Sequence, residues 1–267
     1  VSLLMDLSSE MILSILPIFL VTGLGVSVLT LGLIEGFAEG LASVIKAFSG
    51  ALSDYLKKRK ILVVIGYGLS TLTKPFFALA STATWIFAAR FVDRLGKGIR
   101  VAPRDSLIAD STSTKIRGTA YSLRQALDSL GALLGPIFAI IILYLTTNNF
   151  RLVLWFAVIP AVLCIVVLIF GVKESTLKKN ISRKKSYFLF KNFLKITPVI
   201  WLFFLTVFIL NLGHFSEAFL LLRGQEIGLE ISFIPIVFVV MNAAYAIVAI
   251  PFGHLADKVG FFILIVY

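Results

Sequence analysis

Fifteen charged side chains lie within the first five apolar stretches of this chain, and they are the groups best placed to do chemistry. Seven are acidic and eight are basic: Asp6, Glu10, Glu35, Glu39, Asp93, Asp105 and Asp128, with Lys46, Lys74, Arg90, Arg94, Lys97, Arg100, Arg104 and Arg124. An unpaired charge at the centre of a bilayer costs roughly 2.5 to 3.5 kcal/mol, so all of them unpaired would cost about 40 kcal/mol. A folding stability of about 10 kcal/mol cannot offset that cost. We therefore expect these groups to pair with one another or to line a wet cavity.

Their spacing predicts the helix faces on which they lie. Five basic residues of one predicted helix fall within about 120° of one face: Arg90, Arg94, Lys97, Arg100 and Arg104. Three further pairs are four residues apart and are neighbours on a helix: Asp6 and Glu10, Glu35 and Glu39, and Arg124 and Asp128. The fourth predicted helix thus presents a cationic stripe to the interior. Acidic faces of the first two helices are its natural partners.

Two roles are open to these groups. A salt-bridge network that only orders the N-terminal helices is favoured for four of them: Arg90, Arg104, Asp105 and Arg124. A cavity or coupling role is favoured for six: Asp6, Glu10, Glu35, Glu39, Arg94 and Lys97. Four more complete the candidate substrate or coupling set: Asp93, Arg100, Arg124 and Asp128. Partners that exchange as helices move would serve both roles at once.

Polar residues in the second half of the chain are candidates for the facing wall of a site. Asn211, His214 and Glu217 follow an i, i+3, i+6 series that drifts over about 120° of one helix face. Asn242 lies on the next predicted helix. The alternative for His214 and Glu217 is a paired polar couple near the outer end of their helix.

Composition identifies the elements that position these side chains. The chain is 59% hydrophobic and 15% charged, with 24 Phe and a mean hydropathy of +1.00, whereas soluble domains are nearer half apolar. A helical crossing needs roughly 20 apolar residues, and backbone groups in lipid must be satisfied within the segment. We predict an all-α polytopic membrane protein with eight crossings and the start of a ninth: 3–22, 30–52, 61–81, 84–109, 119–145, 151–172, 197–222, 231–252 and 261 onward. Because the chain opens at Val1 in apolar sequence, we expect a fragment without a short leader and the final helices.

The basic residues predict an orientation. Alternate loops hold fifteen Lys and Arg, eight of them between 173 and 195, whereas the opposite loops hold only Arg151 and Arg223. By the positive-inside rule the basic loops and the N-terminus are cytoplasmic, in a plasma (inner) membrane. The segment 173–196 is expected to lie on anionic lipid as a linker. Despite the net charge of +11, short loops without aromatic stacking residues argue against a nucleic-acid partner.

No enzymatic constellation is found. Gly96-Lys97-Gly98 lacks the spacing and the Ser or Thr of a phosphate loop, and Gly66-Tyr67-Gly68 lacks the last glycine of a dinucleotide fingerprint. The two histidines are far apart and Cys164 is the only cysteine, so no metal site or internal disulfide is predicted. We expect no catalytic residues, no cofactor and no metal.

One short signature occurs twice. Gly50-Ala51-Leu52-Ser53-Asp54 and Gly253-His254-Leu255-Ala256-Asp257-Lys258-Val259-Gly260 lie 203 residues apart. If a crossing with its loop takes about 34 residues, that interval holds six crossings. The chain is therefore predicted to be a duplicated six-helix unit, with an N-terminal bundle over 1–172, a basic linker over 173–196 and an incomplete second bundle over 197–267.

These signatures resemble the loop motif of the major facilitator superfamily of secondary transporters. Arg90-Phe91-Val92-Asp93-Arg94-Leu95-Gly96 resembles the family's fourth-helix motif, and Gly131-Ala132-Leu133-Leu134-Gly135-Pro136 its fifth-helix antiporter motif. Tyr55 and Lys57 depart from the first signature, and Ala139 and Ile140 depart from the antiporter motif. The resemblance implies conformational roles for the motif residues: Gly50, Asp54, Arg90, Gly96, Gly131, Gly135, Pro136, Gly253, Asp257, Lys258 and Gly260. The stretch Val1–Met11 is similar to a prokaryotic branch near the drug exporters.

The resemblance implies two six-helix bundles with a solute site between them. We expect secondary transport by alternating access, with proton-coupled export as the leading hypothesis: a carboxyl among Asp6, Glu10, Glu35 and Glu39 would exchange a proton for the solute. One alternative is uptake or exchange of an anionic solute bound by Arg94, Lys97 and Arg100. Another is a membrane sensor or assembly factor that moves no solute. The expected partners are a small solute, protons and the lipid bilayer, and the protein is expected to act as a monomer.

Overall fold

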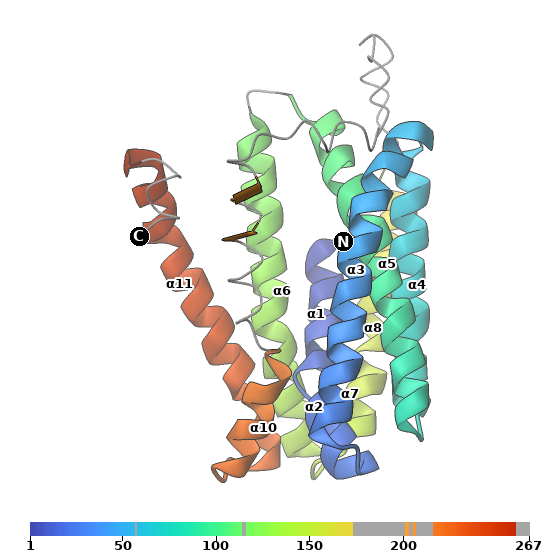
Figure 1. The fold of residues 1–267 in the computed structure, drawn as a ribbon, viewed down its shortest axis with the longest axis vertical. Coiled ribbons are helices and arrows are strands. Elements are labelled where there is room, and N and C mark those ends of the chain that lie inside the picture. Colours follow the sequence, from blue (N-terminus) through green and yellow to red (C-terminus); the bar gives the residue numbers. More distant parts are fainter. Residues whose placement is uncertain (57, 114–115, 173–200, 203–204, 207–215, 260–267) are drawn as a thin grey trace.

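The structure, a computed structural model, describes residues 1–267 except 57, 114–115, 173–200, 203–204, 207–215 and 260–267 (Figure 1). Throughout these described residues the regular secondary structure is helical, as predicted. Six helical stretches among them are long and apolar enough to cross a membrane: Ser2–Gly23, Val28–Ser53, Arg59–Leu79, Arg117–Leu145, Phe150–Gly171 and Ile231–Val248. Each lies within a few residues of a predicted crossing.

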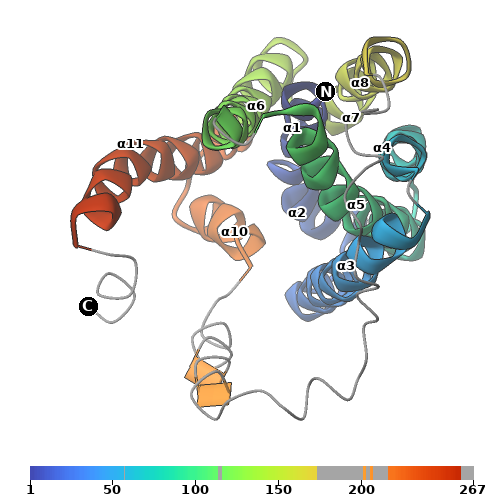
Figure 2. The same ribbon diagram turned by 90° about the horizontal axis from the view of Figure 1, so that it is seen from above.

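A seventh helix, α5 (Ala83–Ser111), also has the length of a membrane crossing. Its 29 residues extend over about 43 Å. It carries eight charged residues, which is too many for a helix that faces lipid. Two neighbours, α3 (Val28–Leu56) and α4 (Arg59–Leu79), pack along its length and cover it (Figure 2). The stripe predicted over 84–109 therefore lies on a helix that buries Arg90, Arg94 and Arg100 against its neighbours and exposes apolar residues on its other side.

The first crossing consists of three helical pieces. The helix α1 (Ser2–Leu13) is followed by a single turn, α2 (Leu16–Ile18), and by the π-helical segment η1 (Phe19–Gly23). Pro17 explains the interruption, because proline has no backbone N–H and its ring clashes with the carbonyl four residues earlier. The break separates the acidic face of α1 from the segment that follows it.

The helix α6 (Arg117–Leu145) lies very close to α1. A Cβ added at Gly131 would lie 2.6 Å from the carbonyl oxygen of Leu3, and one added at Gly135 would lie 2.7 Å from the Cβ of Glu10. Small residues allow such close approach of two helix backbones. The two glycines therefore hold the acidic face of α1 directly against α6. On the other side of α1, α7 (Phe150–Phe156) and α8 (Val158–Gly171) complete this group of helices.

The helices near the C-terminus contact this group at one end and along part of α6. They are α10 (Ala218–Glu226), the 3₁₀ turn η4 (Ile231–Phe233) and α11 (Ile236–Val259). Their buried residues Leu221 and Ile234 join an apolar cluster with Leu16, Leu20 and Leu143. Beyond this contact α11 diverges from α6, and its far end is well separated from α6 in both views (Figures 1 and 2).

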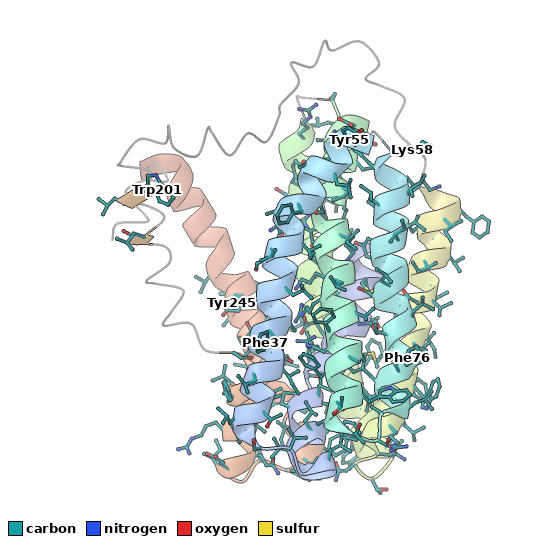
Figure 3. The ribbon with its side chains drawn as sticks, turned by 45° about the vertical axis from the view of Figure 1, so that its right-hand side comes forward. Phe37, Tyr55, Lys58, Phe76, Trp201 and Tyr245 are labelled. Carbon is teal, nitrogen blue, oxygen red and sulfur yellow. The ribbon has the colours of Figure 1, made fainter. Side chains whose placement is uncertain are left out.

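The end to which α11 diverges also holds the basic connection between α3 and α4, and we call it the basic end. Here α3 meets α4 beside Lys58 (Figure 3), and Lys60 donates a hydrogen bond of 2.9 Å to the carbonyl of Ile169 near the end of α8. Arg151 and Arg223 lie at the opposite end, on helices that begin or end there. Among the described residues, the basic and non-basic helix ends therefore alternate as predicted from the sequence.

Both repeated signatures begin inside helices. Gly50 and Asp54 lie in the last turns of α3, and Gly253 and Asp257 lie in the last turns of α11. The predicted crossing 231–252 ended before His254, whereas α11 continues to Val259 and makes His254 helical. The linker 173–196 lies outside the described residues. The division into bundles over 1–172 and 197–267 stays a prediction.

Candidate functional site

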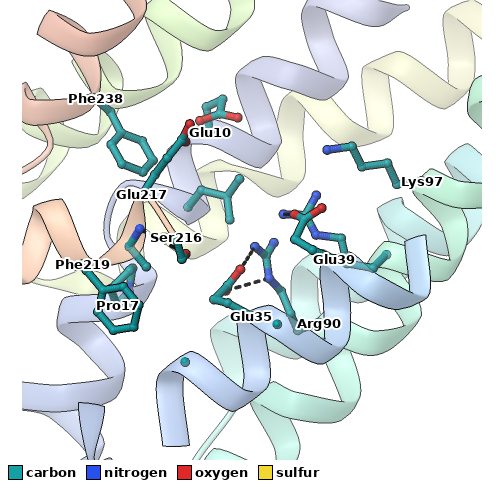
Figure 4. Close-up of a pocket in the computed structure, with 15 residues that line it drawn as sticks. Glu10, Pro17, Glu35, Glu39, Arg90, Lys97, Ser216, Glu217, Phe219 and Phe238 are labelled. Carbon is teal, nitrogen blue, oxygen red and sulfur yellow. Dashed lines mark hydrogen bonds and ion pairs between the residues drawn. The ribbon is translucent and has the colours of Figure 1, made fainter. Parts of the chain in front are cut away.

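A cavity of about 690 Å³ lies where α1, α3 and α5 face α10 and α11 (Figure 4). Its charged lining consists of seven side chains: Glu10, Glu35, Glu39, Arg90, Arg94, Lys97 and Glu217. Six of these were predicted as substrate or coupling residues, and Arg90 was predicted as a motif residue. These six residues thus meet in one cavity, and their role in binding or coupling stays a prediction.

Arg90 on α5 and Glu35 on α3 form a buried ion pair with two contacts. The Nε–Oε1 distance is 3.0 Å and the Nη2–Oε2 distance is 2.5 Å. Both residues are less than a tenth exposed. The planar guanidinium matches the two carboxylate oxygens, which gives such pairs both strength and a fixed geometry. This pair holds α3 and α5 together at the wall of the cavity.

Arg94 and Glu39 repeat this pairing one helical turn further along. The distance between Arg94 Nη2 and Glu39 Oε1 is 2.5 Å. The Glu39 side chain is 54% exposed, whereas that of Arg94 is 6% exposed. Arg94 Nε is buried and finds no hydrogen-bond partner among the described residues. Arg94 is therefore only partly satisfied by its carboxylate partner.

A second buried pair, Lys74 with Asp93, lies behind this wall. Lys74 Nζ on α4 is 3.3 Å from Asp93 Oδ1 and 3.1 Å from the hydroxyl of Ser9 on α1. Asp93 Oδ2 is in turn 4.0 Å from Arg90 Nη1. The charges therefore form one chain of contacts from α1 through α4 and α5 to α3. Asp93 was predicted as a site residue, but Lys74 was recognised only as an intramembrane charge.

Glu10 and Lys97 differ from the paired residues. Neither the Glu10 carboxylate nor the Lys97 ammonium makes an ion pair or hydrogen bond with any side chain that the structure describes. Both line the cavity, and the electrostatic field at Glu10 includes contributions from Lys97, Arg94 and Glu217. Glu217 precedes α10 and extends toward Glu10 (Figure 4). Glu10 and Lys97 are therefore charged groups of the cavity that no described side chain engages.

Asp6, Arg124 and Asp128 form a separate cluster between α1 and α6. Arg124 Nη1 lies 2.7 Å from Asp128 Oδ2, and Asp6 faces Asp128 across the close contact made at Gly131. These three residues were predicted with the substrate or coupling set. None of them lines the cavity.

Arg100 and Arg104 also turn away from the cavity. Arg100 Nη1 donates to the Ser70 hydroxyl at 2.5 Å, and its guanidinium lies 4.6 Å above the ring of Tyr67 on α4. Arg104 Nε is 3.2 Å from Asp105. The predicted cationic stripe is thus divided, because only its first three members reach the cavity. The expectation that Arg100 binds a solute directly does not fit this placement.

The remaining predicted residues lie at helix contacts or outside the described part. Asn242 Nδ2 donates to the carbonyl of Ala132 on α6 at 3.2 Å, so it joins α11 to α6. Gly96 packs against the backbone of Gly66, and Gly50 against Ala102. Pro136 is buried within α6. Asn211, His214 and Gly260 lie outside the described residues, as do the side chains of Asp54, Asp257 and Lys258 and the surroundings of Gly253.

Several lining residues gave no signal in the sequence. They are apolar or small, and they lie mainly on α2, α3, α10 and α11: Leu13, Pro17, Gly32, Gly36, Ser216, Ala218, Phe219 and Phe238. In a chain with 24 Phe, neither spacing nor residue type distinguishes an aromatic residue at a site from one that faces lipid. Their place in the site follows only from the packing of the helices.

The fold and cavity define a multi-pass membrane protein with a charged chamber between two groups of helices. A sequence profile described as Major Facilitator Superfamily matches residues 1–267. The chain belongs to this family.

The relatives and structural matches agree with this family. The chain is 35% identical over 268 residues to an uncharacterised MFS-type transporter of Methanocaldococcus jannaschii, covering 97% of this chain and 65% of the relative. It is 29% identical over 154 residues to a multidrug resistance protein of Photorhabdus laumondii, covering 58% of this chain and 37% of the relative. A crystal structure of a bacterial homologue of the human lysosomal transporter Spinster matches with a TM-score of 0.72 at 18% identity, covering 96% of this chain and 60% of that one. The chain thus spans less than two thirds of the length of these relatives.

Proposed function

We propose that the protein is a secondary active transporter, not an enzyme, and that it moves a small solute by alternating access. The cavity supports this proposal, because it lies between two groups of helices and is lined by charges from both. Transporters of this general kind bind solute at such an interface near the middle of the membrane. The orientation follows the basic connections: the N-terminus and basic end are cytoplasmic, and the membrane is the plasma membrane.

The contact between the two groups of helices supports alternating access. At the end opposite the basic end, Ser232 Oγ donates to Asn148 Oδ1 at 2.7 Å, beside the apolar cluster of α2, α6 and α10. Toward the basic end α11 leaves α6 (Figure 1). The cavity is therefore separated from one side of the membrane by packed residues. A rocking motion that reversed this arrangement would expose it to the other side.

Glu10 is the residue that we propose binds the coupling proton. Glu35 and Glu39 are engaged with arginines, whereas Glu10 has no ion-pair partner among the described residues. A carboxylate withdrawn from water and without an ion-pair partner gains most from binding a proton. Lys97 contributes a nearby positive charge whose effect on Glu10 would change as the helices move.

Export by antiport is the direction that we favour. The named multidrug resistance relative supports it, and so does the Gly131–Pro136 stretch, which resembles an antiporter motif. The second candidate is uptake or exchange of an anionic solute. The observation that favours it is Lys97, which lines the cavity without an ion pair to any described residue.

Proteoliposomes that contain the full chain and a trapped pH-sensitive dye test the proposal. A panel of amines and carboxylic acids is added outside, and internal pH is followed with and without an imposed pH gradient. Antiport requires that at least one solute moves protons in the direction opposite to its own. Solute movement that carries protons in the same direction supports the uptake alternative. Solute binding without any flux contradicts both transport assignments.

A further inference from the structure

A groove of about 620 Å³ runs between α4 and α5, and none of the residues that line it also lines the charged cavity. We propose that this groove binds one straight acyl chain of a membrane phospholipid, from the leaflet at the end opposite the basic end. The groove is thus a lipid site, separate from the proposed transport site and independent of the transport function.

Small side chains between large ones form the groove. Its floor includes Thr73 on α4 and Ala89 on α5, which are both buried. Its edges include Leu72, Phe76 and Trp85, which are about half exposed or more, and the rings of Phe76 and Trp85 lie 6.0 Å apart. These edge residues are exposed where α4 is long and apolar enough to cross a membrane. The groove therefore opens toward the acyl chains of the bilayer.

The polar groups of the groove are engaged within the protein. Trp85 Nε1 donates to the carbonyl of Phe76 at 3.1 Å, and the Trp85 backbone N–H donates to Thr82 Oγ1 at 3.3 Å. Thr73 Oγ1 donates to the carbonyl of Ser70 at 2.7 Å. None of the ten lining residues is charged. Sites for polar solutes present a few polar groups that fix the ligand's orientation, so this lining favours an apolar ligand.

The direction and length of the groove fit one leaflet. Its lining extends along α4 from Leu69 to Phe76 and along α5 from Thr82 to Val92, which is roughly 10 to 15 Å of helix. Phe76 lies far from the basic end (Figure 3). The hydrocarbon core of a bilayer is about 30 Å thick, so one leaflet contributes roughly 15 Å. The groove thus follows the path of an acyl chain from the connection between α4 and α5 toward the middle of the membrane.

Contact, and not burial from water, would hold the chain. Lipid tails are as apolar as the side chains of the groove, so transfer between them supplies no hydrophobic driving force. An unfilled groove would instead leave its walls without dispersion partners. A chain inside it contacts both helices, whereas a lipid beside a smooth helix surface contacts one. We therefore expect one chain to stay bound when the surrounding lipid is removed.

Tryptophan fluorescence tests this expectation, because bromine quenches a nearby indole and Trp85 lies at the edge of the groove. Two forms of the full chain each keep a single tryptophan: Trp155→Phe with Trp201→Phe keeps Trp85, and Trp85→Phe with Trp201→Phe keeps Trp155. Trp155 is the matched reference, since it is about as exposed as Trp85 but lies outside the groove.

Both forms are reconstituted with phosphatidylcholine that is brominated in the upper part of one chain, or with the unbrominated lipid. They are then washed in digitonin, a detergent without an alkyl chain that could replace the lipid. We expect Trp85 to remain quenched after the wash, and Trp155 to recover the intensity that it has with unbrominated lipid. Recovery of Trp85, or equal quenching that remains at both tryptophans, overturns the proposal.

A variant that fills the groove then locates the chain. Ala88→Phe, in the form that keeps Trp85, places a ring in the groove at an exposed position. The quenching of Trp85 that survives the wash is expected to be lost in this variant. Ala47→Phe is the matched control, because Ala47 is exposed on α3 and lines neither the groove nor the charged cavity. Quenching that persists in Ala88→Phe, or that is lost equally in Ala47→Phe, contradicts the assignment to the groove.

Discussion

Arg90 and Glu35 are joined by two short contacts across α3 and α5, and Arg94 and Glu39 repeat the pairing at the same separation along the chain. In both pairs the residues are 55 positions apart, since 90 − 35 and 94 − 39 give the same number. This constant offset is expected for two parallel helices that lie side by side in register. The cavity wall formed by α3 and α5 is therefore held by two consecutive ion pairs.

Removing one partner of the Arg90–Glu35 pair should destabilise the protein strongly. Arg90→Gln leaves the Glu35 carboxylate buried without its guanidinium, and we expect a loss of about 3 to 5 kcal/mol. Unfolding by sodium dodecyl sulfate in mixed micelles measures it. Arg223→Gln breaks the exposed Arg223–Glu226 pair and should cost less than about 1 kcal/mol. Equal losses in the two variants would contradict a structural role for the buried pair.

Lys74 and Asp93 should behave as a coupled pair. Lys74→Met and Asp93→Asn each leave a buried charge, so the double variant should be less destabilised than the sum of the single ones by about 1 to 3 kcal/mol. The same unfolding assay measures the coupling. Combining Asp93→Asn with the distant Glu226→Gln should give additive losses. If the losses of Lys74→Met and Asp93→Asn are also additive in the double variant, the ion pair does not stabilise the protein as described.

The close contact of α1 with α6 should not tolerate a side chain at Gly135. Gly135→Ala places a Cβ 2.7 Å from Glu10 Cβ and 2.9 Å from the backbone oxygen of Leu7, and we expect a loss of about 1 to 3 kcal/mol. Gly118→Ala, on the same helix, meets nothing within 4 Å and should not destabilise the protein. If Gly135→Ala is as stable as Gly118→Ala, α1 is not held this close to α6.

Removing the Glu10 carboxylate should uncouple solute movement from protons. In Glu10→Gln we expect solute exchange down its own gradient to persist, although more weakly, while solute-dependent proton movement falls at least about tenfold. Arg94→Gln and the double variant show whether Arg94 takes part in the same step. Correctly inserted Glu10→Gln protein with unchanged proton movement and pH dependence would show that another group binds the proton.

Much of this site could be predicted from the sequence because its charges are costly in lipid. The i, i+4 spacing of Glu35 with Glu39 and of Arg90 with Arg94 already placed each pair on one helix face, and the structure brings the two faces together. The partner of each charge was less predictable. Arg100 turns to Ser70 and Tyr67 because α4 passes close to α5 at Gly66 and Gly96, which only the packed helices reveal. The role of Phe219 and Phe238 depends in the same way on packing.

The interruption of the first crossing has a mechanical consequence. An unbroken helix bends little, so tilting one end displaces the other. Here Ile15 N donates to Ile12 O at 3.2 Å, a bond of the 3₁₀ type, and Pro17 has no amide hydrogen to donate. The helical crossing is therefore weakened between α1 and α2. The part before Pro17, α1, is held against α6 at Gly131 and Gly135. The part after the interruption, α2, packs on α10. Each part can follow its own neighbour, and Glu10 keeps its contact with Gly135 of α6 while the far end of the same crossing shifts.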